Sequence, residues 1–145
     1  MAGVVVLLAI VYRAVNRAPS ADLSAQAQLL QILDDGGCAS CHSANPELPF
    51  YATWPVAKKL IGQHVADGYA VFDIAPLEEA LRNGTAPHEV DLAKVERSLA
   101  DGSMPMAQYY LVHWGSSITG AKEEVAMAAV QRLACAVLSQ SAGSA

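Results

Sequence analysis

The sequence has few of the features that define several common protein classes. Only 6% of its 145 residues are aromatic and 16% are charged, and the formal net charge is −5. No basic stretch is interleaved with aromatic side chains, so nucleic acid is not an expected partner. No alternating apolar and polar pattern of useful length is present, which disfavours a fold built on β-strands. The composition is that of a small all-α domain with protein partners.

Cysteine is also scarce, and its distribution excludes a disulfide framework. Of the three cysteines, only Cys38 and Cys41 are closely spaced. A structural zinc site usually needs a second such pair or two further histidines, and neither pattern follows. A thioredoxin-type redox pair needs a βαβ context, whereas a helix and a proline-rich loop flank this one. A surface disulfide beside an incidental histidine is the remaining simple alternative.

What the sequence does contain is the stretch GGCASCHSA, residues 36–44, which is typical of covalent c-type haem attachment. The two thiols add to the two vinyl groups at one edge of the porphyrin, so Cys38 and Cys41 must face the same side of a tight turn. The same turn carries His42 under the macrocycle as the proximal iron ligand. The two glycines before the motif allow the backbone to approach the haem closely. We therefore expect a single haem c.

The second axial ligand is expected from the segment SMPM, residues 103–106. A thioether held in a loop by a following proline is a common way to present sulfur to haem iron, which favours Met104 before Pro105. Met106 is the nearest competitor. Either methionine could instead be a flexible core filler.

The remaining histidines and the third cysteine are weaker ligand candidates. His64 lies on the apolar face of a predicted helix, where a hydrogen-bonded core histidine is expected more often than a ligand. His113, beside Trp114, is expected to be structural or packed at the haem edge, and His88 to be solvated. Cys135 points away from the apolar stripe of the last predicted helix, so we expect it to be a packing residue.

Periodicity and turn signals divide the rest of the chain into helices. The predicted bounds are 20–36, 53–68, 85–102 and about 119–138. Ser20 is expected to cap the first helix, and an early proline and a closing glycine mark the second and third. The expected core stripes are Leu92, Val95 and Leu99 in the third helix, and Ala126, Val130, Leu133 and Val137 in the last. Residues 139–145 are expected to be a flexible tail.

The first twelve residues contain no charge, and Arg13 and Arg17 follow them. A complete transmembrane helix needs about 20 apolar residues and a signal-peptide core about 7–15, so length leaves both open. A signal peptide has a basic region before its apolar run, and this sequence has none there. With Arg13 snorkelling, we favour a membrane anchor over residues 1–17. Residues 18–138 would then form a haem domain on the periplasmic side of a bacterial inner membrane.

Two longer runs carry a family resemblance. CASCHSANPELPFYATWPVAKKLIGQHVADGYAVFDI and SMPMAQYYLVHWGSSIT resemble the N-terminal mono-haem domain of membrane-anchored, tri-haem bacterial cytochrome c peroxidases of the quinol-oxidising type, and the broader haem-binding domain family. The resemblance covers about residues 30–138. It implies His42 as the proximal and Met104 as the distal ligand, and a haem that passes electrons to a di-haem peroxidase module. Only one Cys-x-x-Cys-His is present, so peroxidase activity is not expected to carry over.

Together these observations predict a one-electron carrier rather than an enzyme. Iron held by His42 and Met104 is six-coordinate and leaves no position for peroxide or oxygen, so outer-sphere transfer through an exposed haem edge is expected. The expected partners are a redox protein or a peroxidase module, a quinol-linked donor, and the membrane. The alternatives are a haem peroxidase or ligand-sensing domain with an open sixth position, and a structural subunit whose haem mainly stabilises the fold.

Removal of residues 1–17 tests the anchor. The complete chain should sediment with membranes, whereas the shortened chain should be soluble and still reducible, because the deletion takes away the apolar run and leaves the haem motif in place. Membrane fractionation followed by a reduced-minus-oxidised spectrum measures both properties. Unchanged fractionation after the deletion would contradict the anchor.

Overall fold

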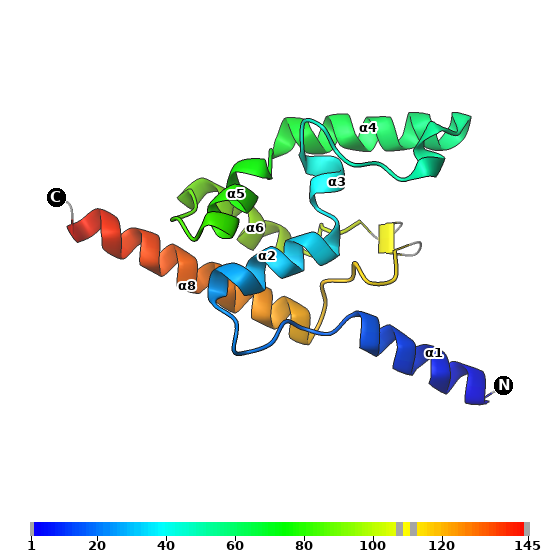
Figure 1. Ribbon diagram of the computed structural model, residues 1–145, viewed down its shortest axis with the longest axis horizontal. Helices are drawn as coiled ribbons and strands as arrows, with labels where there is room; N and C mark the ends of the chain where they lie inside the picture. Colours follow the sequence, from blue (N-terminus) through cyan, green and yellow to red (C-terminus); the bar gives the residue numbers. More distant parts are fainter. Residues whose placement is uncertain (1, 107–108, 111–112, 144–145) are drawn as a thin grey trace.

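The computed structural model describes residues 2–106, 109–110 and 113–143 (Figure 1). Within these residues the secondary structure is helical and contains no strand, which confirms the all-α class. The elements are α1 Ala2–Val15, α2 Ala25–Gly36, α3 Ala39–His42, the 3-10 helix η1 Phe50–Thr53, α4 Pro55–Val71, α5 Ala75–Asn83, α6 Glu89–Asp101 and α8 Ala121–Gly143.

The core lies where α8 packs against α2 and α6, and α5 also packs against α2. The predicted stripe of α6 is buried, and so are Ala126, Val130 and Leu133 of α8, while Val137 is partly buried. These predictions of inward-facing residues are confirmed. Burial of each large apolar side chain stabilises the fold by about 1.5–3 kcal/mol, so the core is the main source of stability.

The first core helix begins later than predicted, whereas its last residue is Gly36, as predicted. Ser24, not Ser20, is the N-cap of α2, since its hydroxyl accepts a hydrogen bond from the Ala27 amide at 3.2 Å. The Ser20 hydroxyl instead accepts from the Asp22 amide in the preceding turn, at 3.3 Å. At the other end the left-handed residue is Gly37, with φ 66°. Helix α2 therefore ends directly against the haem motif.

The second and third predicted helices also differ at their limits. α4 continues past Gly68 to Val71. α6 begins only at Glu89, because the Nδ1 of His88 accepts a hydrogen bond from the Val90 amide at 3.3 Å and caps the helix. His88 is exposed, as predicted, but it also has this structural role.

One helix, α5, is not predicted from the sequence at all. Its signals are Pro76 in the first turn, Leu77 and Leu81 buried one turn apart, and Gly84 as a left-handed C-cap with φ 67°.

The last helix is longer than predicted, because α8 runs to Gly143 with no glycine or proline before that residue. By length and composition α8 is the one described helix that could cross a membrane, but its inner face belongs to the core.

An ion pair between the buried Lys122 and the partly exposed Asp35 fixes the start of α8 against α2. The fully buried Nζ of Lys122 lies 3.1 Å from a carboxylate oxygen of Asp35 and donates a second hydrogen bond to the Gly115 carbonyl at 3.3 Å. A buried cation needs such partners, since an unpaired one is strongly unfavourable. The pair therefore fixes the register in which the two core helices meet.

The short helix α3 packs against α4 at a single glycine. A Cβ on Gly68 would lie 2.6 Å from the backbone carbonyl oxygen of Cys41, so no larger residue fits without moving one of the two helices. Gly62, six residues earlier in α4, has open space around the equivalent position. Only glycine at position 68 allows α4 to lie this close to the haem motif.

These two glycines make a matched pair of substitutions. Gly62→Ala should stabilise the protein by about 0.5–1 kcal/mol, because alanine is the better helix former. Gly68→Ala should destabilise it by about 1–3 kcal/mol, because the helix backbone must shift. Urea unfolding of the haem-loaded chain, followed by circular dichroism, measures both. Equal changes in stability would contradict the close packing of α4 on α3.

Candidate cofactor site

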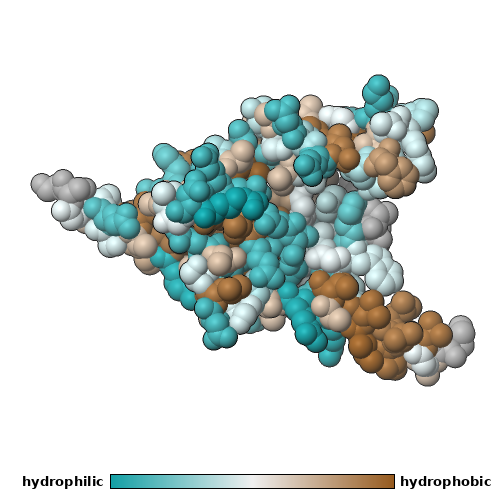
Figure 2. All heavy atoms as spheres, in the orientation of Figure 1, coloured by the Kyte–Doolittle hydropathy of each residue, from teal (hydrophilic) through white to brown (hydrophobic). Residues whose placement is uncertain are grey.

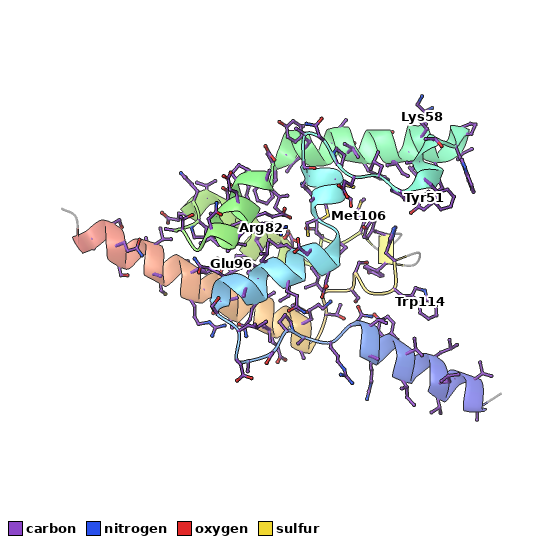
Figure 3. All side chains as sticks on the ribbon, viewed as in Figure 1. Tyr51, Lys58, Arg82, Glu96, Met106 and Trp114 are labelled. Atoms are coloured by element: carbon purple, nitrogen blue, oxygen red, sulfur yellow. The ribbon has the colours of Figure 1, made fainter. Side chains whose placement is uncertain are left out.

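The residues predicted to bind the cofactor meet at one cavity of about 710 Å³, bordered by α3, α4, α6 and the segment 103–106. This volume is within the range of small-molecule and cofactor sites, roughly 300–1,000 Å³. The candidate ligands among its lining residues are Cys38, Cys41, His42, His64, Met104 and Met106. Figure 3 shows Met106 close to α3 and to the end of α2. Two segments that are far apart in the sequence thus face the same space.

The haem motif forms a single helical turn at the end of α2. The His42 amide donates to the Cys38 carbonyl at 3.0 Å, which closes the turn and brings Cys38 and Cys41 to the cavity together. Gly37 makes the sharp entry to this turn possible. Its φ is positive, and a Cβ there would collide with the hydroxyl group of Tyr109.

The electrostatics of the two thiols differ from those of a redox-active pair. Burial, followed by the nearby charge of Glu78, raises the pKa of Cys38 to about 12, and burial also raises the pKa of Cys41. Reactive cysteines have a lowered pKa, so a thioredoxin-type function is not supported. The two cysteines are not joined as a disulfide, and no three His, Cys, Asp or Glu side chains of the described residues cluster as a metal site.

His42 is oriented by two hydrogen bonds to the segment between α4 and α5. Its Nδ1 lies 3.0 Å from the Phe72 carbonyl oxygen, and its own carbonyl accepts from the Ile74 amide at 2.8 Å. Because a carbonyl only accepts, Nδ1 carries the proton. Nε2 is then the unprotonated nitrogen, which is the form that binds a metal.

Both predicted sulfur donors line the cavity from the segment before residue 107. The Met104 residue is 39% exposed, and Met106 is half-buried. The geometry therefore brings both methionines to the site and does not by itself separate them.

His64 differs from its predicted role. It lines the cavity, and its Nε2 is buried without a hydrogen-bond partner among the described residues. Gly68 and Val71, which follow it at helical spacing on α4, line the cavity as well. This stripe is the sequence signal that could have identified His64. A buried, unpaired ring nitrogen is costly, so this atom fits a bound partner better than a satisfied core histidine.

His113 and Cys135 lie outside the cavity lining. The His113 ring stacks on the Tyr109 ring, with centroids 4.1 Å apart. Its Nε2 lies 3.2 Å from the Tyr51 hydroxyl, and its Nδ1 lies 3.0 Å from the Tyr109 carbonyl oxygen. Its predicted structural role is thus supported by three contacts. Cys135 is exposed on α8, so the prediction of a packing residue is wrong.

The cavity as a whole fits a haem. Its inner wall is apolar and suits a flat hydrophobic ring. This wall consists of Leu29, Ile32, Leu33, Val95, Leu99 and Ile118. Lys94 and Arg97 also line it and are the cations that can pair with the propionate carboxylates of haem. Lys94 is held in place by the Phe72 ring, 4.8 Å from its Nζ. Two thiols, a nitrogen donor and sulfur donors complete the set.

Comparison with known proteins agrees with this chemistry. The family model of the haem-binding domain matches residues 4–132. Cytochrome c peroxidase Ccp of Escherichia coli strain K12 is 30% identical over 109 residues, which are 72% of this chain and 23% of that protein, so the chain spans less than a quarter of that relative. No solved structure matches the chain. Because the family match covers most of the sequence and the cavity has the matching donors, the chain belongs to the haem-binding domain family.

Proposed function

We propose that the chain binds a single haem c covalently and transfers one electron at a time. Cys38 and Cys41 would form the thioether bonds, and His42 and Met104 would be the axial ligands. The observation that carries this proposal is the convergence of these four residues on one apolar cavity from two distant segments. When bound, haem iron supplies the one-electron redox centre.

The surrounding residues would then position the haem rather than react. The Phe72 carbonyl fixes the ring and tautomer of His42. Apolar side chains of α2 and α6 would keep water from the porphyrin ring. Lys94 and Arg97 would supply positive charge at the edge of the cavity. A sulfur ligand and a low-dielectric wall would both favour the reduced state, so we expect a comparatively high potential.

His64 is the second candidate for the distal position, on the specific observation that its buried Nε2 has no hydrogen-bond partner among the described residues. Histidine on both faces would lower the potential relative to His/Met ligation. A peroxidase or ligand-sensing function would instead need the sixth position to stay open. With His64, Met104 and Met106 all lining the cavity, a six-coordinate electron carrier is the better-supported proposal.

The proposed location rests on α1, and the proposed electron acceptor rests on the similarity to a cytochrome c peroxidase. α1 is a 14-residue apolar helix without a buried residue, which supports a membrane anchor. The haem domain would lie on the periplasmic side of a bacterial inner membrane and accept electrons from a quinol-linked donor. The chain matches 23% of a cytochrome c peroxidase. The proposed electron acceptor is therefore a peroxidase module or another redox protein.

Covalent attachment can be tested at each cysteine. Cys38→Ala and Cys41→Ala should each weaken or abolish haem retention under denaturing conditions and lower helicity, because the haem would fill the space between α3, α4 and α6. Cys135→Ala is the control and should retain haem fully, since that residue is exposed on α8. Intact-mass spectrometry measures the retained haem. A fully folded, stable protein without haem would contradict this role of the cofactor.

The distal ligand is tested by two neighbouring substitutions. Met104→Ala should remove the axial thioether, lower the reduction potential and change carbon monoxide binding from undetectable to stoichiometric. Met106→Ala should leave the spectrum nearly unchanged. Optical spectra of the ferric and ferrous forms, with and without carbon monoxide, measure these effects. A Met104 variant that stays low-spin would contradict the assignment, and loss of that spectrum on adding His64→Ala would identify His64 instead.

A further inference from the structure

An exposed aromatic patch, defined here as Phe50, Trp54 and Trp114, lies at the end of the molecule that carries α1. Their side chains remain 78%, 59% and 48% exposed, respectively. Phe50 and Trp54 meet edge to face with ring centroids 5.9 Å apart. Aromatic side chains combine large apolar area with a fixed shape, and exposed groups of them mark interaction sites.

Two hydrogen bonds connect the segments that carry this patch to α1. The Tyr51 hydroxyl, in η1, meets His113 at 3.2 Å, and the next residue is Trp114. The Trp114 carbonyl accepts a hydrogen bond from Asn16 Nδ2 at 2.6 Å, directly after the last residue of α1. Figure 1 shows α1 and η1 at the same end, away from the C-terminus, and Figure 3 shows Tyr51 and Trp114 there. The anchor helix and the patch are therefore held together rather than joined by a free linker.

The charge of this end differs from that of the rest of the molecule. Its described segments are 2–17, 44–64, 103–106, 109–110 and 113–120. They contain four of the nine basic residues but one of the fourteen acidic ones, namely Arg13, Arg17, Lys58, Lys59 and Glu47. The chain as a whole has a net charge of −5, so the remainder is strongly acidic. Figure 2 shows α1 as a continuous hydrophobic surface at this end.

We propose that the aromatic patch is a second membrane contact, which binds an anionic lipid surface beside α1. This inference depends on the proposed membrane anchoring by α1. Tryptophan and other aromatic rings favour the boundary between acyl chains and headgroups. Lys58 and Lys59, four and five residues after Trp54, would lie near the anionic headgroups, and the acidic remainder would face away from them. A lipid occupant is favoured over a protein because hydrogen bonds join the segments that carry the patch to the end of an exposed apolar helix. Two contacts would fix the tilt of the haem cavity relative to the membrane.

The two tryptophans of the chain both belong to the patch, so they can report on it directly. The haem-loaded full chain would be placed in vesicles of phosphatidylcholine and phosphatidylglycerol, with and without bromine on the acyl chains. Trp114→Phe leaves Trp54 as the reporter, and Trp54→Phe leaves Trp114. Brominated lipid should quench both reporters. Any quenching by haem is the same in the two kinds of vesicle, so their ratio isolates the contact with lipid.

A control reporter comes from the other end of α4. Tyr69 is also exposed, at 42%, but lies roughly 22 Å along the helix from Trp54. Tyr69→Trp, made together with Trp54→Phe and Trp114→Phe, should not be quenched. Lys58→Glu with Lys59→Glu should reduce quenching of Trp54 by about half with phosphatidylglycerol present and leave it unchanged with phosphatidylcholine alone.

The outcomes separate the patch from the anchor. A chain that floats with the vesicles while Trp54 and Trp114 stay unquenched overturns the patch alone and leaves a protein as its occupant. A chain that does not float with them overturns both the anchor and the patch. Equal quenching of Tyr69→Trp and Trp54 would also overturn the proposal, because it would mean that the domain has no fixed orientation.

Discussion

The hydrogen bonds that join His42 to the segment between α4 and α5 are the constraint on which the site depends. Phe72 and Ile74 hold the side chain and the backbone of His42 from the same short stretch, residues 72–74. That stretch is in turn fixed by α5, whose Leu77 and Leu81 pack in the core. The orientation of one imidazole is thereby linked to the hydrophobic core, and the two cysteines follow because they belong to the same turn.

The rest of the molecule is arranged in two parts around this link. On one side, α2, α5, α6 and α8 form the hydrophobic core, with the ion pair of Lys122 and Asp35 between α2 and α8. On the other side, α3, α4 and the segment 103–106 border the cavity. Gly68 sets how closely α4 approaches the haem motif. The first part supplies most of the apolar burial, while the second supplies the donors that suit a haem.

The sequence predicts the parts of this arrangement that depend on local spacing. The motif from Cys38 to His42 and the inward faces of α6 and α8 follow from such patterns. What could not be predicted depends on contacts between distant segments. The hydrogen bond from His42 to Phe72 spans 30 residues, and the environment of His64 is set by how α4 lies against α3. The short helix α5 was missed because its two buried leucines give too little periodicity.

The proposed electron-transfer role depends on sulfur ligation of the iron. Nuclear magnetic resonance of the reduced, haem-loaded chain with ¹³C-labelled methionine methyl groups tests this ligation. The chain has four methionines, so four methyl signals are observed at most. A methyl group on an axial sulfur lies over the porphyrin ring, and the ring current shifts it far upfield. Ligation by Met104 predicts one strongly shifted methyl signal and ordinary positions for the others. Four methyl signals in the ordinary range would contradict methionine ligation.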